Sequence, residues 1–349
     1  MGRNTNKKIL VTGGAGFIGS NFIDYLAAEY ADCKIIILDS LTYAGSLGNI
    51  PKLNAAEYQG RLEFCYGSIL NAELVASLVR DVDTIVHFAA ETHVTRSIFS
   101  SRDFFETDTL GTHNLINAVL NSGKKLEHFI HISTSEVYGT AEHPVMDEDH
   151  PLNPATPYAS AKCGADRLVY SYWKTHDFPC TIIRPFNNYG PRQHLEKLIP
   201  RFICNILTGE PLNVHGDGNA CRDYLHVSDT CKGIGAILEA PKAQVIGQAF
   251  NLASGNTYSI KDIAGEILDL MEVSDYPIEY IDDRPGQVER HTGCYKKVYG
   301  VTGWTAQIEW RSGLEDTIKW YRENRTVWES QLWMRHVKLY GANGENQSY

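Results

Sequence analysis

The chain has 349 residues, with 32 Lys and Arg against 42 Asp and Glu, so its formal net charge is −10 at pH 7. Apolar residues make up 43% and charged residues 21%, which allows a packed core and excludes an intrinsically disordered chain. The acidic balance argues against a nucleic-acid partner. We expect no membrane span, because no apolar run is long enough, and no signal peptide, because the first residues are polar.

The chain contains eight cysteines at irregular spacings, and none of them forms a C-x-x-C pair. Zinc sites and redox motifs are typically built from such pairs. We therefore predict free thiols of a cytoplasmic protein and no metal site.

In chain order, short apolar runs rich in Ile and Val alternate with longer stretches of helical spacing. The runs predict strands at residues 9–12, 35–39, 84–89, 129–133 and 181–184. Residues 17–30 and 108–121 carry apolar side chains three and four positions apart, as in helices. Runs that are apolar on both faces suit parallel strands covered by helices on both sides. This alternation predicts an α/β fold with a doubly wound parallel sheet of the Rossmann type.

The pattern changes after residue 185. Loops with Gly, Pro, Asn and charged residues separate predicted helices at 198–208, 260–271 and 314–324. We predict a first domain over residues 1–185 and a smaller, mixed domain over residues 186–349. The second domain is expected to cover the carboxyl edge of the sheet and to be partly interleaved with the first.

A glycine motif follows the first predicted strand and opens the first predicted helix. Gly13, Gly16 and Gly19 form G-x-x-G-x-x-G, in which the glycines allow a tight turn, close approach of a pyrophosphate and close packing of helix on strand. The helix N-terminus supplies N–H groups to the phosphates. Asp39 ends the second strand, where a carboxylate accepts hydrogen bonds from both ribose hydroxyls and repels a 2′-phosphate. The motif predicts bound NAD rather than NADP.

A second motif, Tyr158-Ala-Ser-Ala-Lys162, places Tyr and Lys four residues apart on one helix face. A nearby ammonium lowers the pKa of a phenol, so Tyr158 can take a proton from a hydroxyl group near neutral pH. A surface Tyr–Lys pair has the same spacing. The catalytic reading is favoured by the strand that ends at Ser133, one loop earlier.

These and further motifs resemble the extended short-chain dehydrogenase/reductase family, and most of all its nucleotide-sugar 4,6-dehydratases, typified by the dTDP-glucose enzymes. The resemblance covers roughly residues 7–325. It is carried by GGAGFIGS at 13–20, LDSLTYAGSLGN at 38–49, HFAAETHVTRSI at 87–98, STSEVYG at 133–139, PYASAK at 157–162, RPFNNYGPRQ at 184–193, EKLIPRF at 196–202 and RDYLHVSD at 222–229.

The resemblance implies an NAD-dependent nucleotide-sugar dehydratase, a lyase that makes a 4-keto-6-deoxyhexose. Thr134 would hydrogen-bond the sugar O4, and Tyr158 would deprotonate it as hydride leaves C4. Glu136 would remove the C5 proton, water would leave across C5 and C6, and the hydride would return to C6. The resemblance also implies a homodimer paired through the helices around 108–121 and 159–173.

The resemblance implies two sets of binding residues. The cofactor set is Gly13, Gly16, Phe17, Ile18, Gly19, Asp39, Ser68, Ala89, Ala90, Thr107, Ser133, Tyr158 and Lys162. The substrate set is Glu91, His93, Asn187, Asn188, Lys197, Leu198, Arg222, Asn251 and Arg284. Lys and Arg suit the diphosphate of a nucleotide sugar.

Several residues depart from the dTDP-glucose type. Ser135 stands between Thr134 and Glu136, where that type has an Asp that acts as an acid. Thr-Ser-Glu also resembles the triplets of GDP-mannose 4,6-dehydratases and of UDP-glucuronate decarboxylases, so decarboxylation and 4-epimerisation stay as alternatives; a non-catalytic NAD-binding protein is a further one. Glu136 favours chemistry at C5. Ser68 and Asp108 replace the usual Asp and Asn, and residues 288–291 also differ.

Overall fold

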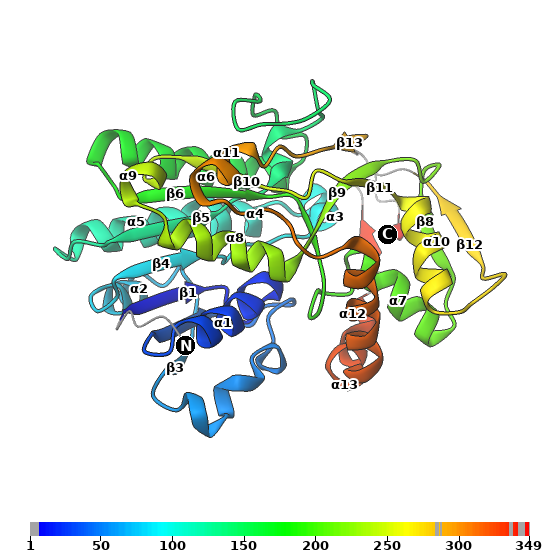
Figure 1. The fold of residues 1–349 in the computed structure, drawn as a ribbon, viewed down its shortest axis with the longest axis horizontal. Helices are drawn as coiled ribbons and strands as arrows, with labels where there is room; N and C mark the ends of the chain where they lie inside the picture. Colours follow the sequence, from blue (N-terminus) through cyan, green and yellow to red (C-terminus); the bar gives the residue numbers. More distant parts are fainter. Residues whose placement is uncertain (1–6, 283–285, 287, 335–337, 341–345, 349) are drawn as a thin grey trace.

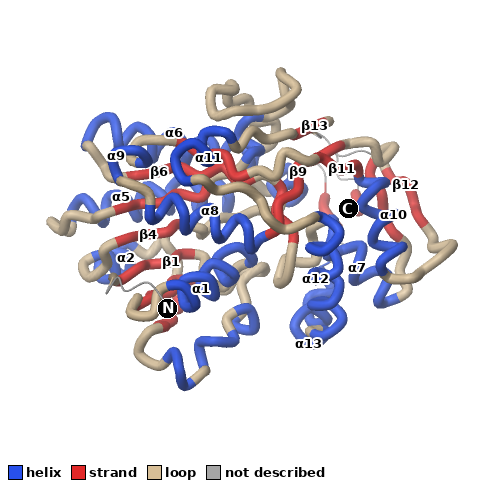
Figure 2. Tube along the Cα trace, viewed as in Figure 1, coloured by secondary structure: helices blue, strands red, loops and turns tan. Residues whose placement is uncertain are grey.

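The structure is a computed structural model that describes residues 7–282, 286, 288–334, 338–340 and 346–348. A large layered α/β part fills one side of the molecule, and a smaller part made of helices and short strands lies beside it (Figure 1). Figure 2 shows the strands of the large part running side by side between helices.

The large part is built on a seven-stranded sheet in the order β10-β6-β5-β4-β1-β2-β3, and every neighbouring pair is parallel. Its strands are β1 (Lys8–Thr12), β2 (Lys34–Asp39), β3 (Leu62–Tyr66), β4 (Thr84–His87), β5 (His128–Ile132), β6 (Cys180–Pro185) and β10 (Ala249–Leu252). The predicted doubly wound parallel sheet is confirmed. Its strand order reverses direction between β1 and β4, which is where ligands bind in open α/β sheets.

Alternate strand residues face opposite sides of the sheet, so each face has its own core. Ile9 and Val11 belong to one core, and Leu10 of the same strand belongs to the other. The first face is covered by α1 (Phe17–Glu29), α8 (Val227–Glu239) and α11 (Lys296–Thr302). The second face is covered by α2 (Ala72–Val79), α5 (Thr112–Asn121) and α6 (Pro157–His176). This arrangement explains why the strands are apolar at successive positions.

Short elements fill the connections of the large part. They are η1 (Leu47–Asn49), η2 (Pro51–Asn54), η3 (Ala56–Tyr58), α3 (Val94–Phe99), α4 (Arg102–Phe104), the π-helix η4 (Phe105–Gly111), η5 (Ser135–Tyr138) and α9 (Lys242–Val245). The helix predicted at 108–121 is therefore a π-helical turn followed by α5. π-Helical turns are uncommon and are frequent at functional sites.

The smaller part has its own core, formed mainly by α7 (Leu198–Thr208), α10 (Ile260–Leu270) and α12 (Trp310–Glu323). The remaining elements are β7 (Asn187–Tyr189), β8 (Leu212–His215), β9 (Cys221–His226), β11 (Thr257–Ser259), β12 (Ile278–Ile281), β13 (Arg290–His291), α13 (Arg325–Trp328), η6 (Glu329–Met334), β14 (Lys338–Tyr340) and β15 (Asn346–Ser348). Strand β9 pairs with β7, β11 and β13, β8 pairs with β12, and β14 pairs with β15.

The second half of the chain returns to the large part. Strand β10 forms an edge of the main sheet beside β6, and α8 and α11 complete one of its helical layers. The three segments lie beyond residue 185, so the two parts are interleaved along the sequence. None of the eight cysteines forms a disulfide. In the part of the chain that the structure describes, no helix combines the length and hydropathy that crossing a bilayer requires.

Candidate active site

The glycine loop joins β1 to α1. Gly13 has a φ of +70°, and a Cβ there would lie 2.6 Å from the backbone nitrogen of Ala89. A Cβ on Gly19 would lie 2.3 Å from the carbonyl oxygen of Gly13. The N-cap Gly16 has no side chain to cap the first turn, which includes Phe17 and Ile18. The backbone N–H groups of that turn are therefore available to an anion, which fits a pyrophosphate.

Asp39 closes the loop from the end of β2. Its Oδ2 accepts a hydrogen bond from the backbone N–H of Ala15 at 2.9 Å, and its Oδ1 accepts one from Leu41 at 2.8 Å. Each carboxylate oxygen has a second lone pair, which suits a ribose hydroxyl. Burial raises the pKa of Asp39, against the two backbone hydrogen bonds. Ser68 follows β3, and its hydroxyl accepts a hydrogen bond from the N–H of Leu70 at 3.1 Å.

Helix α6 carries the Tyr–Lys pair into the core. The Thr156 hydroxyl caps the helix by accepting the N–H of Ala159, and Pro157 occupies the first turn. Tyr158 is 7% exposed and Lys162 is 3% exposed. The ammonium group of Lys162 donates to the carbonyl oxygen of Ile132 at 2.7 Å, which ties α6 to the end of β5. The pair is therefore part of the interior, and a surface pair is excluded.

The Thr-Ser-Glu triplet follows β5 and begins η5. The Thr134 hydroxyl accepts the N–H of Glu136 at 3.2 Å and is also hydrogen-bonded to the phenol of Tyr158. Ser135 is buried, whereas the side chain of Glu136 is 20% exposed. The negative charge of Glu136 raises the pKa of Tyr158. The structure therefore brings Thr134, Glu136 and Tyr158 together, and the carboxylate of Glu136 is partly exposed.

Burial dominates the electrostatics of the pair. It raises the pKa of Tyr158, the negative charge of Asp108 raises it further, and the Thr134 hydrogen bond lowers it. Burial lowers the pKa of Lys162, whereas the carboxylates of Asp108 and Asp166 raise it. A bound cation beside Tyr158 would lower the pKa of the phenol.

Asp108 lies in η4 and is 1% exposed. Its Oδ1 accepts the backbone N–H of Glu91 at 2.7 Å, while its Oδ2 has no hydrogen-bond partner among the described residues. Its neighbour Thr109 donates to the carbonyl of Ala161 at 2.9 Å, which fixes η4 against α6. Thr107 is partly exposed on the same turn.

A buried ion pair anchors the end of β5. Arg184 donates to both oxygens of Asp166, at 2.9 and 3.0 Å, and the two side chains are 2% and 0% exposed. The Ser133 hydroxyl donates to Asp166 at 2.8 Å. Asp166 lies four residues after Lys162 on α6, so this pair links the catalytic helix to β5 and β6.

Several predicted substrate residues meet near Glu196. This carboxylate lies 3.7 Å from Nε2 of His93, 3.5 Å from Nδ1 of His194 and 3.2 Å from the ammonium of Lys197. Lys197 also donates to the carbonyl of Thr92 at 2.7 Å. Burial lowers the pKa of His93 to about 4.

Glu91 and His93 both follow β4. Burial and then the negative charge of Glu196 raise the pKa of Glu91 to about 7. Ala89 and Ala90 precede Glu91 at the carboxyl end of that strand and are partly exposed. Leu198 begins α7 directly after Lys197 and is also partly exposed. The structure therefore gathers these residues at one edge of the sheet.

The other predicted substrate residues are placed differently. Asn187 is partly exposed on β7, and Arg222 on β9 donates to the carbonyl of Cys221 at 2.9 Å. The amide of Asn188 bonds within the protein, donating to Phe186 and accepting from Thr230. Arg284 lies outside the described residues.

Asn251 is fully buried on β10. It accepts a hydrogen bond from the hydroxyl of Tyr138 at 2.8 Å and donates to the carbonyl of Met146 at 3.1 Å. These bonds give Asn251 a role inside the core, and this geometry does not support the predicted contact with a nucleotide.

Sequence reasoning missed several site residues. Glu196 lies in a motif of the resemblance but was not predicted as a site residue. His194 and Lys197, which are close to it in the sequence, could have indicated a cluster of ion pairs. Asp166 was missed, although its spacing of four from Lys162 places it on the same helix face. His291 was noted only within a divergent segment, and no local signal connects it with Glu136, which lies 3.9 Å away.

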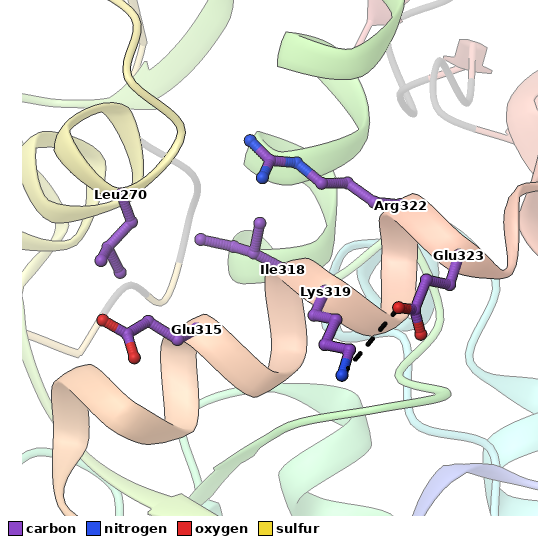
Figure 3. Close-up of a pocket in the computed structure, with 6 residues that line it drawn as sticks. All are labelled: Leu270, Glu315, Ile318, Lys319, Arg322 and Glu323. Atoms are coloured by element: carbon purple, nitrogen blue, oxygen red, sulfur yellow. Dashed lines mark ion pairs between the residues drawn. The ribbon is translucent and has the colours of Figure 1, made fainter.

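A groove of about 230 Å³ lies away from these residues, on α10 and α12 (Figure 3). It is lined by Leu270, Glu315, Ile318, Lys319, Arg322 and Glu323, and none of them is a predicted site residue. The lining is mostly charged, and Lys319 pairs with Glu323 at 4.0 Å. Among the described residues, no group of His, Cys, Asp and Glu side chains is arranged to hold a metal ion.

Comparisons with known proteins agree with this geometry. The model of the GDP-mannose 4,6 dehydratase family matches residues 10–317. A low-salt glycan biosynthesis protein, Agl12, of Haloferax volcanii is 42% identical over 90% of this chain and 98% of its own. A dTDP-glucose 4,6-dehydratase of Actinoplanes is 37% identical over 92% of this chain and 99% of its own.

The solved structures include DesIV, a dTDP-glucose 4,6-dehydratase from Streptomyces venezuelae with NAD bound. It superposes with a TM-score of 0.88 at 39% identity, covering 93% of this chain and 99% of the other. The glycine loop, the Tyr–Lys helix and the Thr-Ser-Glu turn all lie inside the segment that the family model matches. This chain therefore belongs to the GDP-mannose 4,6-dehydratase family, within the extended short-chain dehydrogenases/reductases.

Proposed function

We propose that this protein is an NAD-dependent nucleotide-sugar 4,6-dehydratase that converts a nucleoside-diphosphate hexose to its 4-keto-6-deoxy derivative. One observation carries the proposal. The partly exposed carboxylate of Glu136 lies in the turn that also places the Thr134 hydroxyl on the phenol of Tyr158. Removing a C5 proton requires such a base, and a simple 4-epimerase does not need one.

Tyr158 is the base in the first proton transfer. Thr134 holds the phenol and can share a hydrogen bond with the sugar O4, from which Tyr158 takes the proton. The ammonium group of Lys162 is held by the carbonyl of Ile132, and we assign to it the positive charge that favours the phenolate. NAD bound at the glycine loop would supply the hydride acceptor and donor of the reaction.

The second proton transfer belongs to Glu136. Once C4 is a ketone, the C5 proton is acidic enough for a carboxylate to remove it, and the C6 hydroxyl leaves as water. Ser135 is buried next to Glu136, and its hydroxyl is a poor acid. We therefore assign both proton transfers of this step to Glu136.

In this proposal, residues 1–185 bind the dinucleotide cofactor and residues 186–349 make most contacts with the sugar nucleotide. Lys197 and Arg222 are the cations for the diphosphate, and Glu91 and His93 face the sugar from the other part. Gly13, Gly19 and Asp39 form the proposed cofactor site. NAD is the proposed dinucleotide, because the carboxylate of Asp39 accepts hydrogen bonds from ribose hydroxyls. Asn251 and Arg284 are not needed for this arrangement.

A homodimer is part of the proposal. Large apolar side chains are exposed on η4, α5 and α6, where a monomer would leave them in water. These side chains are Phe105, Leu110, Leu120 and Tyr170. A second copy of the chain would cover them by pairing the same helices. A cytoplasmic location is also proposed, and it is supported by eight cysteines that form no disulfide.

A mass-spectrometric assay tests the reaction. The protein and added NAD are incubated separately with dTDP-glucose, UDP-glucose, GDP-mannose, UDP-N-acetylglucosamine and UDP-glucuronate. We expect loss of water from one hexose. Loss of carbon dioxide from UDP-glucuronate alone would replace the proposal by a decarboxylase, and an isomer of unchanged mass would replace it by an epimerase.

A matched pair of variants tests the role of Tyr158. Tyr158→Phe removes one hydroxyl from the site and should lower kcat by about 10²–10⁴-fold while NAD still binds. Tyr299→Phe makes the same change on α11, where the side chain is exposed, and should leave kcat unchanged. Full activity of Tyr158→Phe would contradict the assignment of the base.

A further inference from the structure

We infer that His291 is a positioning residue for Glu136, whose protonated form it stabilises by accepting a hydrogen bond at Nδ1. The inference rests on the proposed function, because it deepens the role of Glu136 in removing the C5 proton. His291 ends β13, and Glu136 lies in η5, 155 residues earlier in the chain. The fold places Nδ1 of His291 3.9 Å from Oε1 of Glu136.

The tautomer of His291 follows from its other ring nitrogen. Nε2 lies 2.6 Å from the carbonyl oxygen of Gly139, and a carbonyl oxygen only accepts hydrogen bonds. Nε2 therefore carries the proton and donates it to Gly139. In the neutral ring Nδ1 then bears a lone pair, and Oε1 of Glu136 lies 3.9 Å from Nδ1.

The surroundings of Nδ1 leave Glu136 as its natural partner. His291 is fully buried, and within the described residues Nδ1 has no hydrogen-bond partner. Burial lowers the pKa of His291, the charge of Glu136 raises it, and the charges of Arg222 and His150 lower it. The hydrogen bond to Gly139 also raises this pKa, but burial is the largest effect and the pKa is lowered, which favours the neutral ring. The ring centroids of Phe186 and His291 lie 6.3 Å apart.

The unprotonated Nδ1 can accept a hydrogen bond from Glu136 only when Glu136 carries a proton. A carboxylate and a lone pair repel each other, whereas a carboxylic acid donates a hydrogen bond to that lone pair. Catalytic hydrogen bonds are often long before the substrate binds. The inference requires Oε1 of Glu136 to approach Nδ1 from 3.9 Å to hydrogen-bond distance. His291 therefore offers a hydrogen-bond acceptor to Glu136 at the moment when Glu136 has taken the C5 proton.

The protons balance through this pair. Glu136 takes the C5 proton, and the electron pair of the C5–H bond forms the second bond between C5 and C6. The C6–O bond breaks, and the departing hydroxyl takes a proton from Glu136 and leaves as water. One proton enters from C5 and one leaves with the C6 oxygen, so no further acid is needed where Ser135 stands.

The test separates the two halves of the reaction. Rapid quenching and mass spectrometry of the NAD-loaded protein follow the 4-keto hexose nucleotide, lighter than the substrate by two hydrogen atoms, and the dehydrated product. His291→Gln keeps a donor for Gly139 and removes Nδ1. We expect water loss to slow by about 10²-fold, while C4 oxidation changes by less than about threefold and the 4-keto hexose accumulates.

Two further variants complete the test. His291→Asn carries an amide oxygen near the place of Nδ1, so it should lose water at least about tenfold faster than His291→Gln. Glu289→Gln removes an exposed charge two residues away and should change neither half. Equal loss of both half-reactions in His291→Gln would mean that the ring only supports the fold, and unchanged water loss would also overturn the inference.

A measurement without turnover keeps this inference separate from the proposed function. In nitrogen NMR of the unmodified protein, His291 should be the Nε2–H tautomer, and its Nδ1 resonance should move in Glu136→Gln. An unmoved resonance overturns the inference whether or not the chain is a dehydratase. Absence of water loss from every sugar nucleotide would instead overturn the proposed function.

Discussion

The Asp166–Arg184 pair offers a prediction with a defined magnitude. In Asp166→Ala, the guanidinium of Arg184 would stay in the core without its counter-ion. Arg184 is 2% exposed and donates two hydrogen bonds to Asp166, through Nε and Nη2, and a third through Nη1 to the hydroxyl of Tyr138. Because the site is buried, bulk water does not replace the carboxylate. Ser133 would lose its acceptor as well.

Removing one member of a buried ion pair costs about 3–5 kcal/mol of unfolding free energy. A domain of ordinary stability has about 5–15 kcal/mol in total, so the substitution should remove at least about a fifth of it. Burial alone would raise the pKa of Asp166, but the charges of Arg184 and Arg167 outweigh it and lower this pKa. The stabilisation is therefore present above the pKa of an unfolded Asp and is lost as the pH falls through the folded-state pKa.

Chemical denaturation at neutral pH measures the effect. Arg167→Ala is the matched control, because Arg167 pairs with the same carboxylate but is 42% exposed, and it should cost less than about 1 kcal/mol. The double variant Asp166→Ala/Arg184→Met removes the unpaired guanidinium and should be more stable than Asp166→Ala alone. An Asp166→Ala cost below about 1 kcal/mol would refute the reasoning.

Two predictions concern the cofactor and the base. Asp108→Asn removes a buried negative charge that raises the pKa of Tyr158, so the acid limb of the kcat–pH profile should move to lower pH; a stationary limb would contradict this. Gly19→Ala places a Cβ 2.3 Å from the Gly13 carbonyl oxygen and should weaken NAD binding at least about tenfold in equilibrium dialysis. Gly265→Ala, in open space on α10, should leave NAD affinity unchanged, and equal affinity of both variants would argue against the loop.

The sequence by itself determined the α/β class, the glycine loop and the Tyr–Lys helix. Each of these features depends only on residues that are close in the sequence. The apolar runs of the strands, the spacing of the glycines and the i, i+4 spacing of Tyr and Lys can be recognised without knowing which distant segments they contact. The helix predicted at 198–208 has the same bounds in α7. Strand β3 was missed because it lies at an edge of the sheet, where only Leu62 is buried and the sequence shows no continuous apolar run.

Only the tertiary structure decided the relations between distant segments. Residues 249–252 lie in the second half of the chain and still form an edge of the main sheet, and Asn251 is thereby placed in the core. Glu136 meets His291, and Asp166 meets Arg184, through strand order and helix packing. No local pattern encodes such pairs, because each depends on how the whole chain buries its apolar faces.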